Sequence, residues 1–138
     1  MSAKTLNIGL IGSGFMGQAH ADAYRRAALL YRDLPLVPVL HTLADATPAL
    51  ASAAAARFGF ASATADWRAM VRDPEIDVID ITTPNAMHVD MALAAIEAGK
   101  HVLVEKPLAT TVADCDRIID AAARRGVVLA VGYHQRFR

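Results

Sequence analysis

Short apolar segments alternate with helix-like segments along the chain, and this order constrains the fold more than any other feature. Strand-like apolar runs occupy residues 6–11, 39–44, 60–63, 76–82, 101–104 and 127–133. Helix-like segments separate them at residues 15–31, 47–59, 66–72, 87–98 and 112–125. Because a crossover helix returns the chain to the same end of a sheet, this order predicts parallel βαβ units. The predicted fold class is therefore α/β: a doubly wound parallel sheet of Rossmann type, with about six strands and helices on both faces.

Local signals mark several of the element ends. Thr47 followed by a proline is typical of a helix N-cap and first helical position, and Gly59 is typical of the end of that helix. Asp66 is expected to cap the short helix that follows. Pro38 has no backbone N–H to donate, so we expect it only at the start of the second strand.

Composition and charge limit the function classes. The chain has 138 residues, 54% hydrophobic and 20% charged, which fits one domain with its own core. The net charge of +0, without any basic block, disfavours binding to nucleic acid or to an anionic membrane. The one cysteine, Cys115, fits a reducing compartment and excludes a cysteine-based zinc site. No apolar run approaches the ~20 residues of a membrane span. We therefore expect a cytoplasmic protein without a metal site.

Residues 12–17 read G-x-G-x-x-G between a predicted strand and a predicted helix. In that context the pattern is typical of a dinucleotide-binding loop, whose amide groups and helix dipole face the pyrophosphate. The first glycine permits the turn, the second lets the backbone approach the phosphates, and the third lets the helix pack on the strand. A plain glycine-rich turn is the alternative. The candidate cofactor-binding residues of this loop are Gly12, Ser13, Gly14, Phe15, Met16 and Gly17.

Asp45 follows the second predicted strand, where an acidic residue is expected to accept hydrogen bonds from the adenosine ribose hydroxyls. Its charge would repel a 2′-phosphate, so the sequence favours NAD over NADP. The alternative interpretation of Asp45 is a residue that caps the next helix.

A second polar segment leaves the strand at 76–82, whose end lies beside the first strand at the point where ligands bind in this topology. It contains Thr82, Thr83, Pro84, Asn85 and His88. Pro84 would stiffen the turn and Asn85 could cap the next helix. A plain strand–turn–helix junction explains both of these residues but does not require His88.

The segments TTPNAMH (82–88), AGKHVLVEKPLA (98–109) and GVVLAVGYHQRF (126–137), with GSGFMG (12–17), resemble the Gfo/Idh/MocA family of oxidoreductases. The resemblance runs from residue 8 to residue 137. It implies that residues 1–138 are an N-terminal NAD(P)-binding Rossmann domain. The family's larger C-terminal domain, which holds most of the substrate pocket, is not in this chain. The resemblance also assigns His88 and Glu105 to the neighbourhood of the cofactor.

The same resemblance implies a catalytic role for Lys106, over the nicotinamide and in reach of a substrate hydroxyl. Glu105 would orient this lysine or contact the cofactor ribose. Pro107 would fix the turn, and a cis peptide bond is one way to do so because X–Pro bonds tolerate it. The alternative is an ordinary Glu–Lys pair at the surface, which contributes little to stability.

The implied activity is hydride transfer between a nicotinamide cofactor and a sugar, inositol or related polyol. Alternatives on the same fold are a non-enzymatic NAD(P)-sensing or regulatory protein, and a lyase or hydrolase that uses NAD transiently. We expect a homo-oligomer for the full-length form. Among the other residues, His20 and His41 are interpreted as structural, Trp67 as the anchor of its short helix, and Tyr133, His134 and Arg136 as neighbours of the cleft.

Overall fold

The computed structural model describes residues 4–137, and these contain a six-stranded sheet in the order β3-β2-β1-β4-β5-β6. Every neighbouring pair of strands is parallel. The predicted Rossmann-type sheet is therefore confirmed. Its strands are β1 (Lys4–Ile11), β2 (Leu36–Ala44), β3 (Ser62–Thr64), β4 (Val78–Ile81), β5 (His101–Val104) and β6 (Leu129–Val131).

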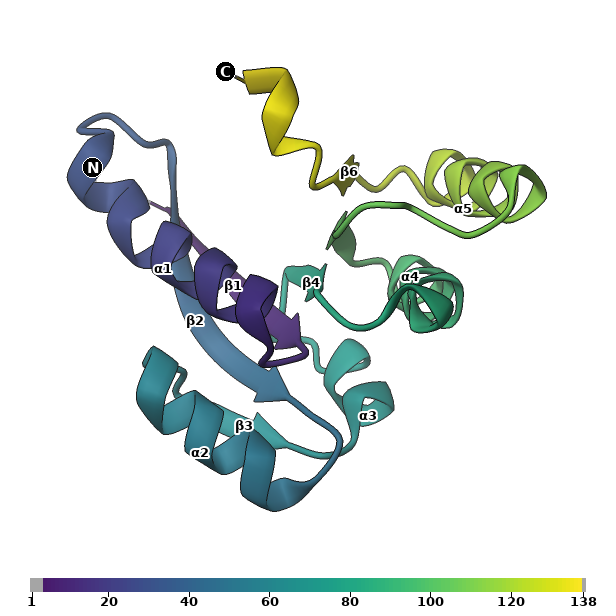
Figure 1. Cartoon of the computed structure of the whole chain (residues 1–138). Helices are drawn as coiled ribbons and strands as arrows, with labels where there is room; N and C mark the ends of the chain where they lie inside the picture. The colour runs from purple at the N-terminus through teal and green to yellow at the C-terminus, as the bar shows by residue number, and fades with distance from the viewer. Residues whose placement is uncertain (1–3, 138) are drawn as a thin grey trace.

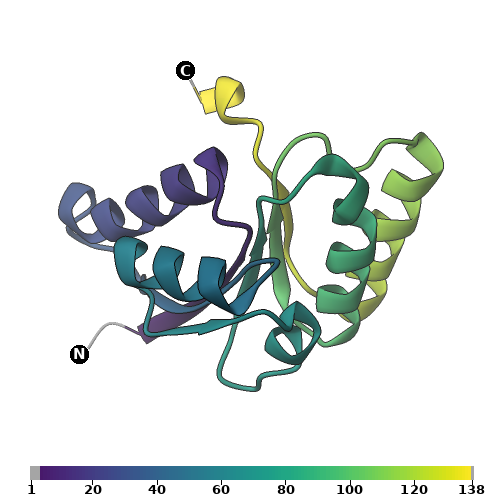
Figure 2. The same ribbon diagram turned by 60° about the horizontal axis from the view of Figure 1, so that its bottom comes forward.

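Helices cover both faces of the sheet, as predicted (Figures 1 and 2). One face carries α1 (Phe15–Leu30) and α2 (Pro48–Phe58), and the other carries α3 (Trp67–Val71), α4 (His88–Glu97) and α5 (Val112–Arg125). Two short 3₁₀ helices, η1 (Asn85–Met87) and η2 (His134–Phe137), follow β4 and β6. Within residues 4–137, no helix has the length and apolar character needed to cross a membrane.

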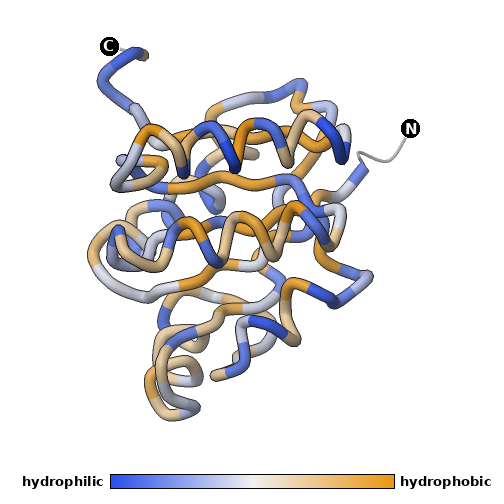
Figure 3. Tube along the Cα trace, turned by 90° about the vertical axis from the view of Figure 1, so that its right-hand side faces the viewer, coloured by the Kyte–Doolittle hydropathy of each residue, from blue (hydrophilic) through white to orange (hydrophobic). Residues whose placement is uncertain are grey.

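The alternation of side chains along each strand divides the core into two clusters, one per face. Leu10 and Leu43 pack with the alanines of α2 on the α1–α2 face. Ile79 and Ile81 pack with α4 and α5 on the opposite face. Figure 3 shows the inner strands coloured as hydrophobic, with helices outside them that alternate between polar and apolar residues. The central strands are therefore buried on both sides, which suits a parallel sheet.

Three short-range capping predictions, at Thr47, Gly59 and Asp66, are confirmed. The Thr47 hydroxyl accepts a hydrogen bond from the Leu50 amide at 3.2 Å, and the Asp66 carboxylate accepts one from the Ala69 amide at 3.0 Å. Gly59 ends α2 in the left-handed region, with φ of +87°. These signals act within three or four residues, which is why the sequence alone locates them.

The expectation for Pro38 is wrong, because β2 begins at Leu36 and Pro38 lies inside the strand, paired with Leu6 of β1. On its other side β2 pairs with β3 only from Thr42 to Ala44. At Pro38 the strand therefore has one open edge, and a missing N–H on that edge breaks no ladder hydrogen bond.

Three other boundary predictions also differ from the structure. Asn85 does not cap α4: it begins η1, and the cap position of α4 is Met87, with no side-chain hydrogen bond. The predicted strands at 76–82 and 127–133 are shorter in the structure, as Val78–Ile81 and Leu129–Val131. Apolar residues flank both strands, so the apolar run overestimates the paired segment.

Candidate functional site

A cavity of about 770 Å³ opens where the strand order reverses, at the carboxyl ends of β1 and β4. The glycine loop and the end of β2 form one wall, and the residues after β4 and the start of α3 form the other. The structure brings together nine of the predicted residues in this lining: Gly12, Ser13, Gly14, Phe15, Met16, Asp45, Thr82, Thr83 and Pro84. Open α/β sheets bind ligands at this kind of switch point.

Gly12 and Gly17 are glycines because of close packing within the protein. Gly12 has φ of +99°, and a Cβ there would lie 3.1 Å from the backbone of Thr82. A Cβ on Gly17 would overlap the carbonyl oxygen of Gly12. Both glycines therefore let α1 start directly against the ends of β1 and β4.

Gly14 is a glycine for a different reason. An added Cβ would meet no described protein atom within 4 Å, and its backbone φ of −67° is open to any residue. Gly14 lines the cavity and is the N-cap of α1 without a side-chain hydrogen bond to the first turn. The free amide groups and the positive end of the helix dipole therefore suit an anion such as a pyrophosphate.

Asp45 closes the β2 end of the cavity. One carboxylate oxygen accepts hydrogen bonds from the Ser13 amide at 2.9 Å and from the Ser13 hydroxyl, and the other accepts one from the Ala46 amide at 2.6 Å. Partial burial opposes the charge, but these hydrogen bonds outweigh it and hold the pKa of Asp45 below its usual range. Since Thr47 caps α2, Asp45 is not the helix cap that the alternative interpretation required.

Thr82 ties the β4 side of the cavity to the glycine loop. Its hydroxyl lies 3.0 Å from the Ile11 carbonyl oxygen and 2.9 Å from the Gly12 carbonyl oxygen. Sequence reasoning missed several apolar residues that line the same cavity, among them Trp67, Met87 and Met91. An aromatic residue at the start of the helix after β3 was the one signal for Trp67, and the two methionines carried none.

His88 and Asn85 do not line this cavity. His88 is fully buried, with Nδ1 2.8 Å from the Pro107 carbonyl oxygen and Nε2 2.9 Å from the Thr83 carbonyl oxygen. It therefore joins the loop after β4 to the loop after β5. Asn85 is exposed at the start of η1.

Glu105 and Lys106 lie at the end of β5, and the Lys106–Pro107 peptide bond is cis, which is the one way of fixing this turn that the sequence suggested. The Lys106 side chain is exposed, whereas the Glu105 side chain is buried and accepts a hydrogen bond from the Lys106 backbone amide at 3.0 Å. Glu105 lines a second, apolar cavity of about 670 Å³ on the β5–β6 side of α1. This cavity shares Phe15 and Met16 with the first, and it also contacts Tyr133 and His134.

His20 also has contacts that the sequence did not predict. It was interpreted as structural, yet its ring lies between the carboxylates of Asp80 and Glu105. The signal in the sequence was Asp80 itself, an acidic residue inside the apolar strand β4.

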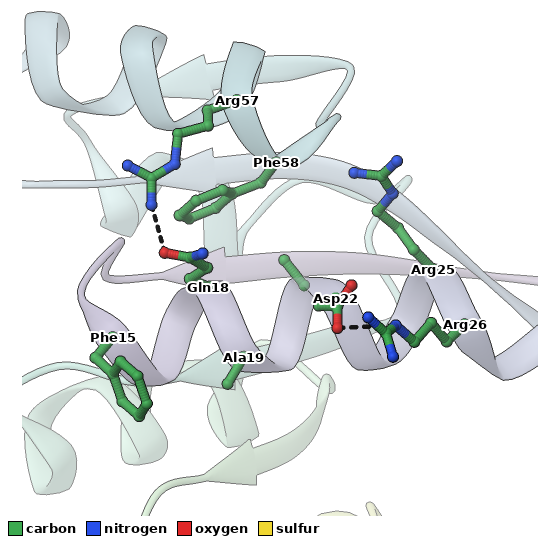
Figure 4. A pocket seen from close by; sticks show the side chains of 9 residues that line it. Phe15, Gln18, Ala19, Asp22, Arg25, Arg26, Arg57 and Phe58 are labelled. Atoms are coloured by element: carbon green, nitrogen blue, oxygen red, sulfur yellow. Dashed lines mark hydrogen bonds and ion pairs between the residues drawn. The ribbon is translucent and has the colours of Figure 1, made fainter.

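A third hollow, of about 400 Å³, lies between α1 and α2, away from the strand ends (Figure 4). Two of its three arginines contact neighbouring side chains: Arg57 donates to Gln18, and Arg26 pairs with Asp22 at 3.0 Å. Phe15 is the one predicted site residue in its lining. We therefore take the first cavity as the candidate site.

Comparisons with known proteins agree with this geometry. A family model described as an oxidoreductase family with an NAD-binding Rossmann fold matches residues 6–133. The chain is 46% identical to levoglucosan dehydrogenase of Pseudarthrobacter phenanthrenivorans over 133 residues, which cover 96% of this chain and 34% of the relative. It is 38% identical to an inositol 2-dehydrogenase of Acidothermus cellulolyticus over 135 residues, 97% of this chain and 38% of the relative. The chain therefore spans about a third of the length of these relatives.

Solved structures of oxidoreductases also resemble this chain. An NAD binding oxidoreductase from Klebsiella pneumoniae superposes with a TM-score of 0.93 and 56% identity, over 96% of this chain and 35% of that one. Levoglucosan dehydrogenase in complex with NADH and levoglucosan superposes with a TM-score of 0.94 and 46% identity, over 96% of this chain and 36% of that one.

Proposed function

The chain belongs to the Gfo/Idh/MocA family of oxidoreductases, with its NAD-binding Rossmann fold, and we propose that residues 1–138 hold the cofactor for hydride transfer to or from a sugar, inositol or related polyol. The observation that supports this proposal best is the open space beside Gly14. A Cβ at Gly14 would meet no described protein atom within 4 Å, and this residue lines the cavity.

The residues present fit a dinucleotide. The amide groups at the start of α1 would hold the pyrophosphate, and the Asp45 carboxylate would accept hydrogen bonds from the adenosine ribose. Trp67, at the β3 side of the cavity, would contact the adenine end. A 2′-phosphate would bring negative charge to Asp45, so we propose NAD as the preferred cofactor over NADP.

Lys106 is the proposed catalytic residue. Bound NAD would supply the hydride acceptor or donor. The ammonium group of Lys106 is exposed at the end of β5, where it can donate a hydrogen bond to a substrate oxygen or relay its proton. The buried Glu105 carboxylate holds the Lys106 amide and therefore fixes the backbone that carries this side chain.

The chain spans about a third of the length of its relatives, and its one cysteine fits a reducing compartment. We propose that a further domain completes the substrate pocket, that the longer form is a homo-oligomer, and that it works in the cytoplasm. The apolar lining of the β5–β6 cavity and the exposed Tyr133 beside it are consistent with a surface that is covered in the longer form.

The test is NAD reduction with a panel of anhydrosugars, glucosides and inositols, using a form of the protein that extends past residue 138. Replacing Lys106 with Ala should lower turnover by a factor of ~10²–10⁴ and change NAD affinity little. Lys4→Ala, which removes an exposed lysine from the far end of β1, is the control. NAD binding without turnover on any substrate would favour the regulatory alternative, and unchanged turnover in Lys106→Ala would contradict the catalytic role of Lys106.

A further inference from the structure

A buried charged cluster lies beneath α1, on the face of the sheet where β4 and β5 end. It consists of His20 and Tyr24 from α1, Asp80 from β4 and Glu105 from the end of β5. The Asp80 side chain is fully buried, and Glu105 is 5% exposed. Carboxylates at such depth are costly unless they are paired and hydrogen-bonded, so the cluster needs a positive partner.

The His20 ring supplies that partner. Its Nδ1 lies 2.9 Å from one Asp80 carboxylate oxygen, and its Nε2 lies 3.1 Å from a Glu105 carboxylate oxygen. An ionised carboxylate can only accept hydrogen bonds, so both ring nitrogens donate only if the ring carries both protons. A neutral ring would satisfy one carboxylate and direct a lone pair at the other. With both carboxylates ionised, the geometry therefore requires the imidazolium form of His20.

Neighbouring groups restrict each carboxylate further. The Tyr24 hydroxyl donates to Asp80 at 2.8 Å, and burial beside Asp80 raises the pKa of Tyr24, which keeps that proton in place. On the other side, a Cβ on Gly132 of the β6 end would lie 2.7 Å from a Glu105 carboxylate oxygen. A side chain at Gly132 would therefore force the Glu105 carboxylate to shift from its position beside His20. The second Glu105 carboxylate oxygen accepts the hydrogen bond of the Lys106 amide.

We infer that His20 is a positioning residue of the cofactor site: as an imidazolium it holds Glu105 against Asp80, and through Glu105 it fixes the backbone of Lys106. This inference rests on the proposed function, because it assigns the buried cluster to the nicotinamide half of the proposed NAD site. Asp45 and β2 lie on one side of the β1–β4 switch point, and β5 lies on the other. A dinucleotide with its adenosine at Asp45 therefore extends its nicotinamide toward the loop that His20 supports.

The contact of the His20 ring with Asp80 and Glu105, here called the His20 bridge, should depend on pH. Burial alone lowers the pKa of His20, but the hydrogen bonds and charges of Asp80 and Glu105 outweigh burial and raise it above 6.5. The stabilisation of the fold by this contact is therefore complete below pH 6.5, the pKa of His20 in the unfolded chain. It is lost as the pH rises through the raised pKa of His20 in the folded chain. The groups that face this ring or line its cavity are Tyr24 of α1, Asp80 of β4, Glu105 after β5, and Tyr133 and His134 after β6.

The first experiment follows the chain by NMR as the pH is raised, with the His20 ring and the Lys106 backbone amide observed together. The Lys106 amide has no hydrogen bond to His20, and Glu105 contacts both, so we expect the shift of this amide to change at the titration midpoint of His20. The change should disappear in His20→Gln and persist in His41→Gln, which removes a histidine from β2. If the chemical shift of the Lys106 amide does not change as His20 titrates, the inference is overturned.

The second experiment compares the affinities of NAD and ADP-ribose, which lacks the nicotinamide. His20→Gln should weaken NAD binding by about tenfold and leave ADP-ribose within about twofold, the scale of one charge-assisted hydrogen bond. Equal loss for both ligands would overturn the positioning role. If the wild-type chain bound neither ligand, the proposed function would fail, while the Lys106 titration would still decide whether the bridge exists. That titration uses the wild-type chain, so it also stands if His20→Gln fails to fold.

Discussion

At the scale of single residues, the glycine loop shows how one motif combines two physical demands. Gly12 and Gly17 face the protein, where a side chain would strike the Thr82 backbone or the Gly12 carbonyl group. Gly14 faces the cavity, where a side chain would strike nothing in the described chain. The same residue type is thus required by packing at two positions and by the ligand at the third.

This difference predicts effects of different size on the free energy of unfolding within one loop. Gly17→Ala should lower the free energy of unfolding by ~1–3 kcal/mol, because the loop or α1 must move to admit the methyl group. Gly14→Ala should change it by less than ~0.5 kcal/mol, because the methyl group enters open space. Chemical denaturation of both variants measures the difference, and equal losses would contradict the assignment of the two glycines.

Asp45 gives a prediction about cofactor choice. Removing its charge with Asp45→Ala should narrow the preference for NAD over NADP by about tenfold or more, since like charges at close range cost several kcal/mol. NAD binding itself should persist, because the pyrophosphate is held by the α1 amides. Calorimetric titration with both cofactors measures the ratio. A wild-type chain that already prefers NADP would contradict the role given to Asp45.

At the scale of elements, helix starts place the loops that surround the site. α5 follows the Lys106 loop and packs against α4 and the sheet. Its first turn is fixed by Thr111, whose hydroxyl accepts a hydrogen bond from the Asp114 amide at 3.1 Å and donates one to the Asp114 carboxylate at 2.8 Å. The hydrogen bonds from Thr111 and Arg117 lower the pKa of Asp114.

Two adjacent threonines test this cap directly. Thr111→Ala should cost about 1 kcal/mol of unfolding free energy, the usual value for a lost N-cap. Thr110→Ala should cost less than ~0.5 kcal/mol, because Thr110 is exposed and precedes the cap. The difference should shrink as the pH falls through the lowered pKa of Asp114, because the protonated acid gives up its charge-assisted contacts. Denaturant titrations of the two variants at neutral and acid pH provide the measurement.

At the scale of the whole molecule, the sequence predicts what depends on neighbouring residues and on the order of elements. The strand–helix order predicted the parallel sheet, and local caps such as Thr47 predicted helix ends. The sequence does not predict long-range contacts. Nothing near His20 in the chain indicates that the folded sheet places the His20 ring between Asp80 and Glu105. Trp67 reaches the cavity for the same reason, since only the pairing of β3 with β2 brings its helix beside Asp45.

The central claim is that the cavity at the carboxyl ends of β1 and β4 holds NAD, and a calorimetric titration of the chain and of Gly14→Val with NAD tests it most directly. Trp67 is the one tryptophan of the chain, so its fluorescence reports independently whether the ligand enters this cavity. The account predicts one saturable site that changes Trp67 emission, and a loss of affinity of about a hundredfold or more in a folded Gly14→Val, whose side chain would occupy the pyrophosphate space. A wild-type chain that releases no heat with NAD, or a folded Gly14→Val that binds NAD as tightly as the wild type, would contradict it.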